Sequence, residues 1–197
     1  MNEQIIVSEN YLWIESEKII RAIKNPDIFY PESSIEGKIK VYEDRVNNWF
    51  LRLAQQMVET KSPEDYIAVS VAISYIEAVE QYRQGKETPN NKSGEWFKKS
   101  AKRIFSTSSS YAIKRLWEEG RCGLFHCGFT NGKTYLSHDG RKALEVKGER
   151  LEINPKKFVE AVVNDFNEHI KELYISKPDS DVIKKFLELW DTRWKNS

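Results

Sequence analysis

Arg121 and His126 stand four residues apart in a short run, and their side chains could do chemistry together. A guanidinium stays charged at any ordinary pH and can hold phosphate oxygens through two parallel hydrogen bonds. An imidazole titrates near neutral pH, so it can accept or release a proton during a reaction. His126 is also one of three histidines in the chain. The pair predicts cleavage of a phosphodiester without a metal ion.

The spacing of the pair constrains how the two side chains can meet. In an ideal helix, positions five apart differ by about 140° around the axis and about 7.5 Å along it. A break at Gly123, which costs about 1 kcal/mol, would let them converge within one chain. Alternatively, two copies of the motif could meet across a two-fold axis and form one composite site. We favour the second arrangement, because it turns an awkward spacing into a shared cleft.

A basic stretch leads into the motif. Residues 92–121 contain eight Lys or Arg and three Glu, whereas the whole chain has a formal charge of +1. The surplus indicates either a solvated helix face or a flank that attracts phosphate groups. The candidates for binding RNA are Lys98, Lys99, Lys102, Arg103, Lys114 and Arg115.

The segment Arg121-Cys-Gly-Leu-Phe-His126 resembles the Arg-x4-His signature of the HEPN superfamily, in particular its bacterial Arg-x-Gly-Leu-x-His variants. The resemblance covers roughly residues 36–175, and its diagnostic part is about eight residues long. It implies a helical bundle that is usually dimeric and often a metal-independent endoribonuclease of toxin–antitoxin or antiviral systems.

The resemblance also implies roles for the two motif residues. Arg121 would hold the scissile phosphate and stabilise its growing negative charge. His126 would act as general acid or base while the RNA 2′-OH attacks, leaving a 2′,3′-cyclic phosphate. The implied partners are RNA, a second copy of the chain and an antitoxin protein, and no cofactor is expected.

Two further residues bear on this hypothesis. Cys122 follows the arginine, where active members often carry Asn, Asp or His, and cysteine is a poor hydrogen-bond partner. Glu77 lies in an apolar helical pattern and would orient Arg121 or His126, or else be an ordinary exposed glutamate. The alternative is therefore a catalytically silent HEPN-fold module for dimerisation or for binding nucleotides, RNA or protein.

Other chemistries fit the sequence less well. Cys122, His126, Cys127 and His138 could supply four zinc ligands, but closely paired cysteines are missing, so we expect no metal site. Cys127 adjoins His126, so their side chains would point apart and would not form a nucleophile–base pair.

Hydrophobic periodicity predicts the elements that position these residues. A helix is expected over residues 36–59, and a second begins at Ser62-Pro63 and runs to about residue 84. Ser93 is expected to cap a helix through residue 105, and another helix leads from residues 106–110 into the motif. Turn dipeptides then mark a small hairpin or meander at about residues 133–153. Helices are expected from Asn154-Pro155 to about residue 174 and over residues 178–194.

These elements predict a mainly α fold, a bundle of four or more helices with one small β insertion after the motif helix. Residues 1–35 would form a lead segment, residues 36–175 the HEPN-like bundle and residues 176–197 a C-terminal helix. The composition, 40% apolar and 31% charged, suits a globular core. No signal peptide or membrane-spanning run is recognisable, so we expect a cytoplasmic protein that does not contact membranes.

Overall fold

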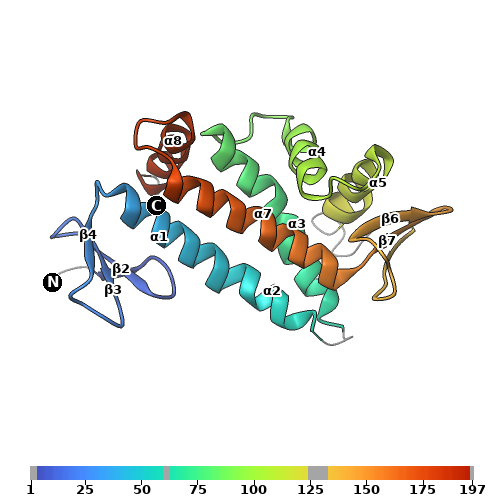
Figure 1. The fold of residues 1–197 in the computed structure, drawn as a ribbon, viewed down its shortest axis with the longest axis horizontal. Helices are drawn as coiled ribbons and strands as arrows, with labels where there is room; N and C mark the ends of the chain where they lie inside the picture. Colours follow the sequence, from blue (N-terminus) through green and yellow to red (C-terminus); the bar gives the residue numbers. More distant parts are fainter. Residues whose placement is uncertain (1–3, 60–62, 124–132, 196–197) are drawn as a thin grey trace.

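The computed structural model describes residues 4–59, 63–123 and 133–195. Six helices contain 58% of the described residues, and two small sheets accompany them. Figure 1 shows the two sheets at opposite ends of the long helices. The fold is therefore mixed α/β, and the expectation of a mainly helical bundle with a single β insertion is correct only in part.

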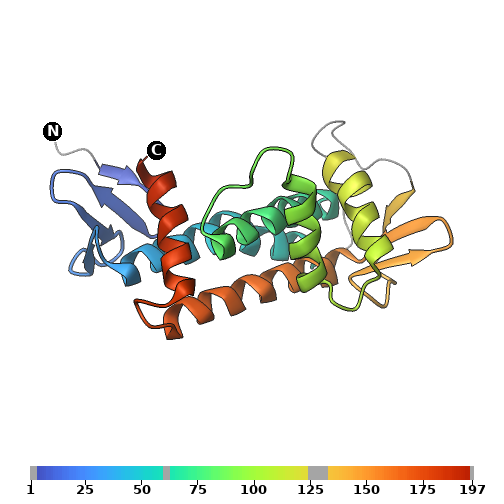
Figure 2. The same cartoon turned by 90° about the horizontal axis from the view of Figure 1, so that it is seen from above.

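Three long helical stretches form the centre of the molecule (Figures 1 and 2). The first is continuous but changes its winding, since a π-helical segment joins two α-helical ones. These stretches are α1 (Ile35–Val46) with η1 (Asn47–Leu51) and α2 (Arg52–Met57), then α3 (Asp65–Gln84), and α7 (Pro155–Ile175). Their bounds agree with the helices predicted for these parts of the sequence to within a few residues.

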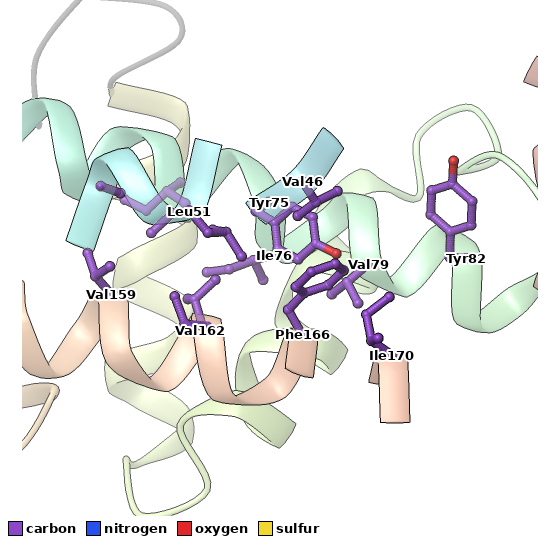
Figure 3. Close-up of a cluster of buried hydrophobic side chains, with 14 of the residues drawn as sticks. Val46, Leu51, Tyr75, Ile76, Val79, Tyr82, Val159, Val162, Phe166 and Ile170 are labelled. Carbon is purple, nitrogen blue, oxygen red and sulfur yellow. The ribbon is translucent and has the colours of Figure 1, made fainter. Parts of the chain in front are cut away.

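Buried side chains from these helices interlock to make the core (Figure 3). The Phe166 ring of α7 lies 5.5 Å from Tyr42 and 5.4 Å from Tyr75, with edge-to-face geometry in both contacts. Leu51 and Ile76 are fully buried beside them. Burying each such side chain stabilises the fold by about 2 kcal/mol, so this apolar packing positions α3 and everything that rests on it.

Capping residues start and stop several helices where the sequence predicts. The Asn154 side chain accepts a hydrogen bond from the Lys157 amide, and Pro155 occupies the first turn of α7. Gly85 ends α3 with a φ of 72°, a left-handed conformation that glycine adopts without strain. Ser93, predicted to be a cap, is instead the first residue of its helix, and its hydroxyl bonds to another helix.

Shorter helices complete the fold around α3 (Figure 2). They are α4 (Ser93–Ile104), α5 (Ser110–Arg115) with the π-helical segment η2 (Leu116–Arg121), and α8 (Asp181–Lys195). The Ser109 side chain caps α5 by accepting from the Ala112 amide at 3.1 Å. Within the described part of the chain, no helix has the length and apolar character to cross a membrane.

An N-terminal sheet lies within the part of the chain predicted to be a lead segment, residues 1–35. Its antiparallel strands are β1 (Gln4–Ile6), β2 (Tyr11–Ile14), β3 (Ile19–Ala22) and β4 (Phe29–Pro31), in that order. Trp13 and Ile20 are cross-strand partners, and both are buried. Lys18 turns the chain between β2 and β3 with a φ of 52°, so no glycine marks this hairpin in the sequence.

The second sheet has the expected position but a different strand order. Its strands are β5 (Thr134–Leu136), β6 (Leu144–Lys147) and β7 (Arg150–Ile153), arranged β5-β7-β6. Strands β6 and β7 form a hairpin around Gly148, whose φ is 58°. Strand β5 pairs with β7 in parallel, so this sheet is a hairpin with an added strand and not a meander.

Candidate active site

The π-helical segment η2 carries Arg121 at its last position. The amide of Cys122 donates to the carbonyl of Trp117, five residues earlier, which is the wide winding typical of π-bulges at functional sites. Gly120 of η2 faces α3, since a Cβ there would lie 3.5 Å from Ile73, at ordinary van der Waals distance. Local winding and close packing together bring Arg121 alongside α3.

Glu77 of α3 faces Arg121. One carboxylate oxygen, Oε2, lies 3.7 Å from Nη2 of Arg121 and accepts a 2.6 Å hydrogen bond from the Ser93 hydroxyl of α4. The Glu77 side chain is 15% exposed and the Arg121 side chain 26%. Three elements thus meet at one carboxylate, and Ser93 fixes the direction of the charge that Arg121 faces.

The Trp117 indole packs against the Arg121 guanidinium. The Arg121 guanidinium carbon lies 5.2 Å from the centre of the indole ring, within the range of a cation–π contact. Phe97 contacts the same indole at a ring distance of 5.3 Å. At Gly94, a Cβ would lie 2.9 Å from the indole, so the glycine permits the close approach of α4. The indole is clamped between α4 and Arg121.

Cys122 follows Arg121 and is partly buried. Burial raises the pKa of its thiol, Arg121 opposes this effect, and Glu118 adds to it. The thiol is therefore protonated at neutral pH and offers a weak S–H donor beside Arg121.

His126 and Cys127 lie outside the described residues. Of the Arg-x4-His motif, the structure describes Arg121, Cys122 and Gly123.

The two arginines among the six candidate RNA-binding residues belong to internal ion-pair networks. Arg103 donates to Glu80 at 2.7 Å and to Asp165 at 2.8 Å, and so links α4 to α3 and α7. Arg115 is buried and donates two hydrogen bonds to Glu119. Burial raises the pKa of the Glu119 carboxyl, but the hydrogen bonds from Arg115 and Thr134 outweigh it, and the net pKa is lowered. These two arginines hold elements together.

The four lysines of the candidate set are exposed on α4 and α5. Lys99 pairs with Glu80 at 2.8 Å and Lys114 lies 3.8 Å from Glu118, while most of each side chain faces solvent. Lys98 and Lys102 are also exposed. Exposed ammonium groups on α4 and α5 suit a phosphate backbone, because such contacts need charge more than fixed geometry.

Sequence reasoning missed the parts of the site that α4 supplies. The hydroxyl of Ser93 and the space left by Gly94 both depend on how α4 packs against α3 and η2. Trp117 had a usable signal, because a tryptophan four residues before an arginine lies on the same helix face and can stack with it.

His138, one of the four zinc ligands considered, has another partner. Its Nε2 lies 2.6 Å from Oδ2 of Asp65, the first residue of α3. Asn154 donates a hydrogen bond to the His138 carbonyl at 2.9 Å. Within residues 4–59, 63–123 and 133–195, no three His, Cys, Asp or Glu side chains are grouped in a way that could hold a metal ion.

Comparison of the chain with protein-family models, with curated proteins and with solved structures returns no match. The functional argument therefore stands on the residues of the motif and on the geometry around Arg121.

Proposed function

We propose that this protein is a metal-independent endoribonuclease of the HEPN type. The observation that carries the proposal is the setting of Arg121, the arginine of the Arg-x4-His motif. It ends a π-helical segment, faces the Ser93-bound carboxylate of Glu77 and rests on Trp117. A guanidinium oriented in this way can meet a phosphate with little further ordering.

The proposed reaction is transesterification within RNA. His126 accepts the proton of a 2′-hydroxyl, the 2′-oxygen attacks the adjacent phosphorus, and the bond from phosphorus to the 5′-oxygen breaks. The leaving 5′-oxygen receives a proton from protonated His126, of the same or of the second copy, and the other product ends in a 2′,3′-cyclic phosphate. Arg121 stabilises the extra negative charge on the phosphate oxygens during attack. The lysines of α4 and α5 attract the flanking phosphates.

We further propose that the enzyme is a homodimer whose two motifs share a cleft. Ile67 and Ser74 lie within about 20° of each other on the exposed side of α3, and Glu77 lies about 60° further around the same helix. Tyr66 and Ile67 on α3, and Phe50 and Leu53 on the preceding helix, are each more than two-fifths exposed. Large exposed apolar side chains of this kind are typical of a surface that a second copy covers.

The alternative is a catalytically silent module of the same fold, which binds RNA, nucleotides or protein. The observation that favours it is Cys122, a protonated thiol at the position next to the motif arginine. Such a thiol gives the phosphate little help, so turnover would depend on Arg121 and His126 alone. An antitoxin protein remains a predicted partner under either reading.

The test is cleavage of a mixed RNA pool in EDTA by the wild type, Arg121→Ala and His126→Ala. We expect cyclic phosphate ends from the wild type and a loss of at least about 100-fold in each variant. Arg52→Ala, which removes an exposed arginine of α2 that pairs with Glu9, serves as a matched control and should cleave normally. Light scattering on the same samples should give the mass of a dimer.

Two outcomes would contradict the proposed nuclease activity, and a third would contradict the proposed homodimer. A folded wild-type dimer that cleaves no RNA would favour the silent module. Equal cleavage by wild type and His126→Ala would show that the motif does not perform the reaction. A strict monomer that still cleaves would remove the composite site and leave the single-chain arrangement.

A further inference from the structure

A second feature of the molecule is a cavity of about 250 Å³ between α1–η1, α3 and α8. Half of the residues that line it are aromatic: Tyr42, Phe50, Tyr75, Tyr82, Trp190 and Trp194. Trp190 and Trp194 stack on each other with ring centres 5.2 Å apart, so α8 contributes two stacked indoles to the cavity wall. A wall of this composition favours a flat, ring-containing ligand.

The charges of the described lining residues are all positive. Arg45 and Arg193 line the cavity, and none of the described lining residues is an aspartate or glutamate. Arg45 donates from Nε to the Val7 carbonyl at 2.7 Å and lies over the Trp49 ring. Burial lowers the pKa of Arg45, which is the effect of partial desolvation on a cation. An anionic group in the cavity would offset that cost.

The other polar groups of the cavity wall include tyrosine hydroxyls, which can donate hydrogen bonds. The hydroxyls of Tyr42 and Tyr75 lie 2.9 Å apart, and the two residues are 3% and 7% exposed. Each hydroxyl carries one hydrogen, so one of them donates to the other and one hydrogen is left for a further acceptor. Burial raises the pKa of Tyr75 well above its usual value, so both of these oxygens keep their hydrogens at neutral pH.

We propose that this cavity is a binding site for a small aromatic carboxylate. The rings of α1, α3 and α8 would enclose the aromatic part, and the Arg45 guanidinium would hold the carboxylate. The volume lies just below the roughly 300 Å³ at which pockets for drug-sized ligands begin, so the occupant has one or two rings. Arg121 is not among the lining residues, whereas Phe50 and Ser74 belong both to the cavity wall and to the surface proposed above for the dimer. Binding of the ligand does not require RNA cleavage.

Calorimetric titration of the full chain with naphthalene-2-carboxylate and with naphthalene-2-carboxamide tests the proposal. The two probes have nearly the same shape and differ in charge. We expect the carboxylate to bind at least about tenfold more tightly, a difference of about 1.4 kcal/mol. In Arg45→Gln this preference should disappear, while Arg52→Gln, outside the cavity, should keep it.

A second variant fills part of the cavity without changing its charge. Ala78→Leu adds three carbon atoms to a side chain that lines the cavity and should weaken the binding of both probes, with the thermal unfolding temperature measured alongside. Equal affinity of the wild type for the two probes would overturn the proposal, as would an unchanged preference in Arg45→Gln. No binding of either probe by the folded wild type at millimolar concentration would also overturn it, and the cavity would then serve as packing space or as part of the dimer contact.

Discussion

Two glutamates one helical turn apart on α3, Glu77 and Glu80, each receive an arginine from a neighbouring helix, but in different ways. Glu80 is 1% exposed, and Arg103 donates to it at 2.7 Å. Glu77 is 15% exposed, and Arg121 lies 3.7 Å from it. A buried pair at hydrogen-bond distance holds helices in place, whereas a longer and more exposed pair orients a guanidinium with less restraint. The same residue types therefore build structure at Glu80 and the proposed site at Glu77.

The largest expected effect is the loss of stability on replacing Glu80, the buried glutamate. Glu80→Ala leaves Arg103 and Lys99 without the carboxylate they share, so we expect a loss of about 3–5 kcal/mol in the free energy of unfolding. Urea denaturation measures it. Glu77→Ala is the matched control and should cost about 1 kcal/mol or less. An equal loss in the free energy of unfolding for the two variants would show that Glu80 and Glu77 do not differ in their contribution to stability.

The next effect concerns His169, a buried neighbour of the Glu80–Arg103 network. Burial and the charges of Arg83 and Arg103 lower its pKa from 6.5 to about 3. Below about pH 6.5 the unfolded chain gains a proton that the folded protein does not, so stability falls by about 1.4 kcal/mol per pH unit until about pH 3.

Denaturation at about pH 7 and about pH 5 should therefore show a contribution of about 2 kcal/mol from His169. His169→Gln cannot titrate, so the stability of that variant should fall less over the same interval. The Glu80 carboxyl, whose pKa is lowered by Lys99 and Arg103 against the effect of burial, adds its loss only at more acidic pH. The same pH dependence in wild type and variant would contradict the assignment to His169.

A smaller effect is expected at Glu77, the more exposed of the two glutamates, and this prediction rests on the proposed function. Glu77→Gln keeps the shape of the side chain and an acceptor for Ser93 but removes the charge that Arg121 faces. We expect RNA cleavage to fall by about tenfold, equivalent to about 1.4 kcal/mol, with little change in stability.

The double variant distinguishes positioning from a general structural role. If Glu77 acts through Arg121, then Glu77→Gln should have no further effect on cleavage in the Arg121→Ala background. An additional tenfold loss in that background would show that Glu77 acts on something else.

The smallest effect is expected at Gly94, which sets the position of the Trp117 indole under Arg121. A methyl group at residue 94 would lie 2.9 Å from the indole, and the cost of overpacking exceeds the gain in helix propensity. We expect Gly94→Ala to lower stability by about 1 kcal/mol. In the Trp117→Phe background the smaller ring leaves room, so the penalty should vanish there. A penalty that persists would mean that the indole is not what Gly94 accommodates.

Much of the helical framework can be predicted from the sequence, because periodic apolar residues and caps act locally. Asn154-Pro155 marks the start of α7, and the apolar positions at three- and four-residue steps mark α1, α2 and α3. The N-terminal sheet could not be predicted in this way. Its strands are three or four residues long, and its β2–β3 turn uses Lys18 with a positive φ where a glycine or asparagine would have signalled a hairpin.

The sequence by itself determined the chemistry that is available: an Arg-x4-His pair, a basic approach to it, and the helices that carry Arg121 and Glu77. Only the tertiary structure decided which charges pair. Arg103 and Arg115 point into internal networks, Glu77 meets Ser93 and Arg121, and Arg45 and Arg193 line an aromatic cavity. The reason is physical: helix formation depends on neighbours within one turn, whereas an ion pair or a cavity depends on burial and distance between segments far apart in the chain.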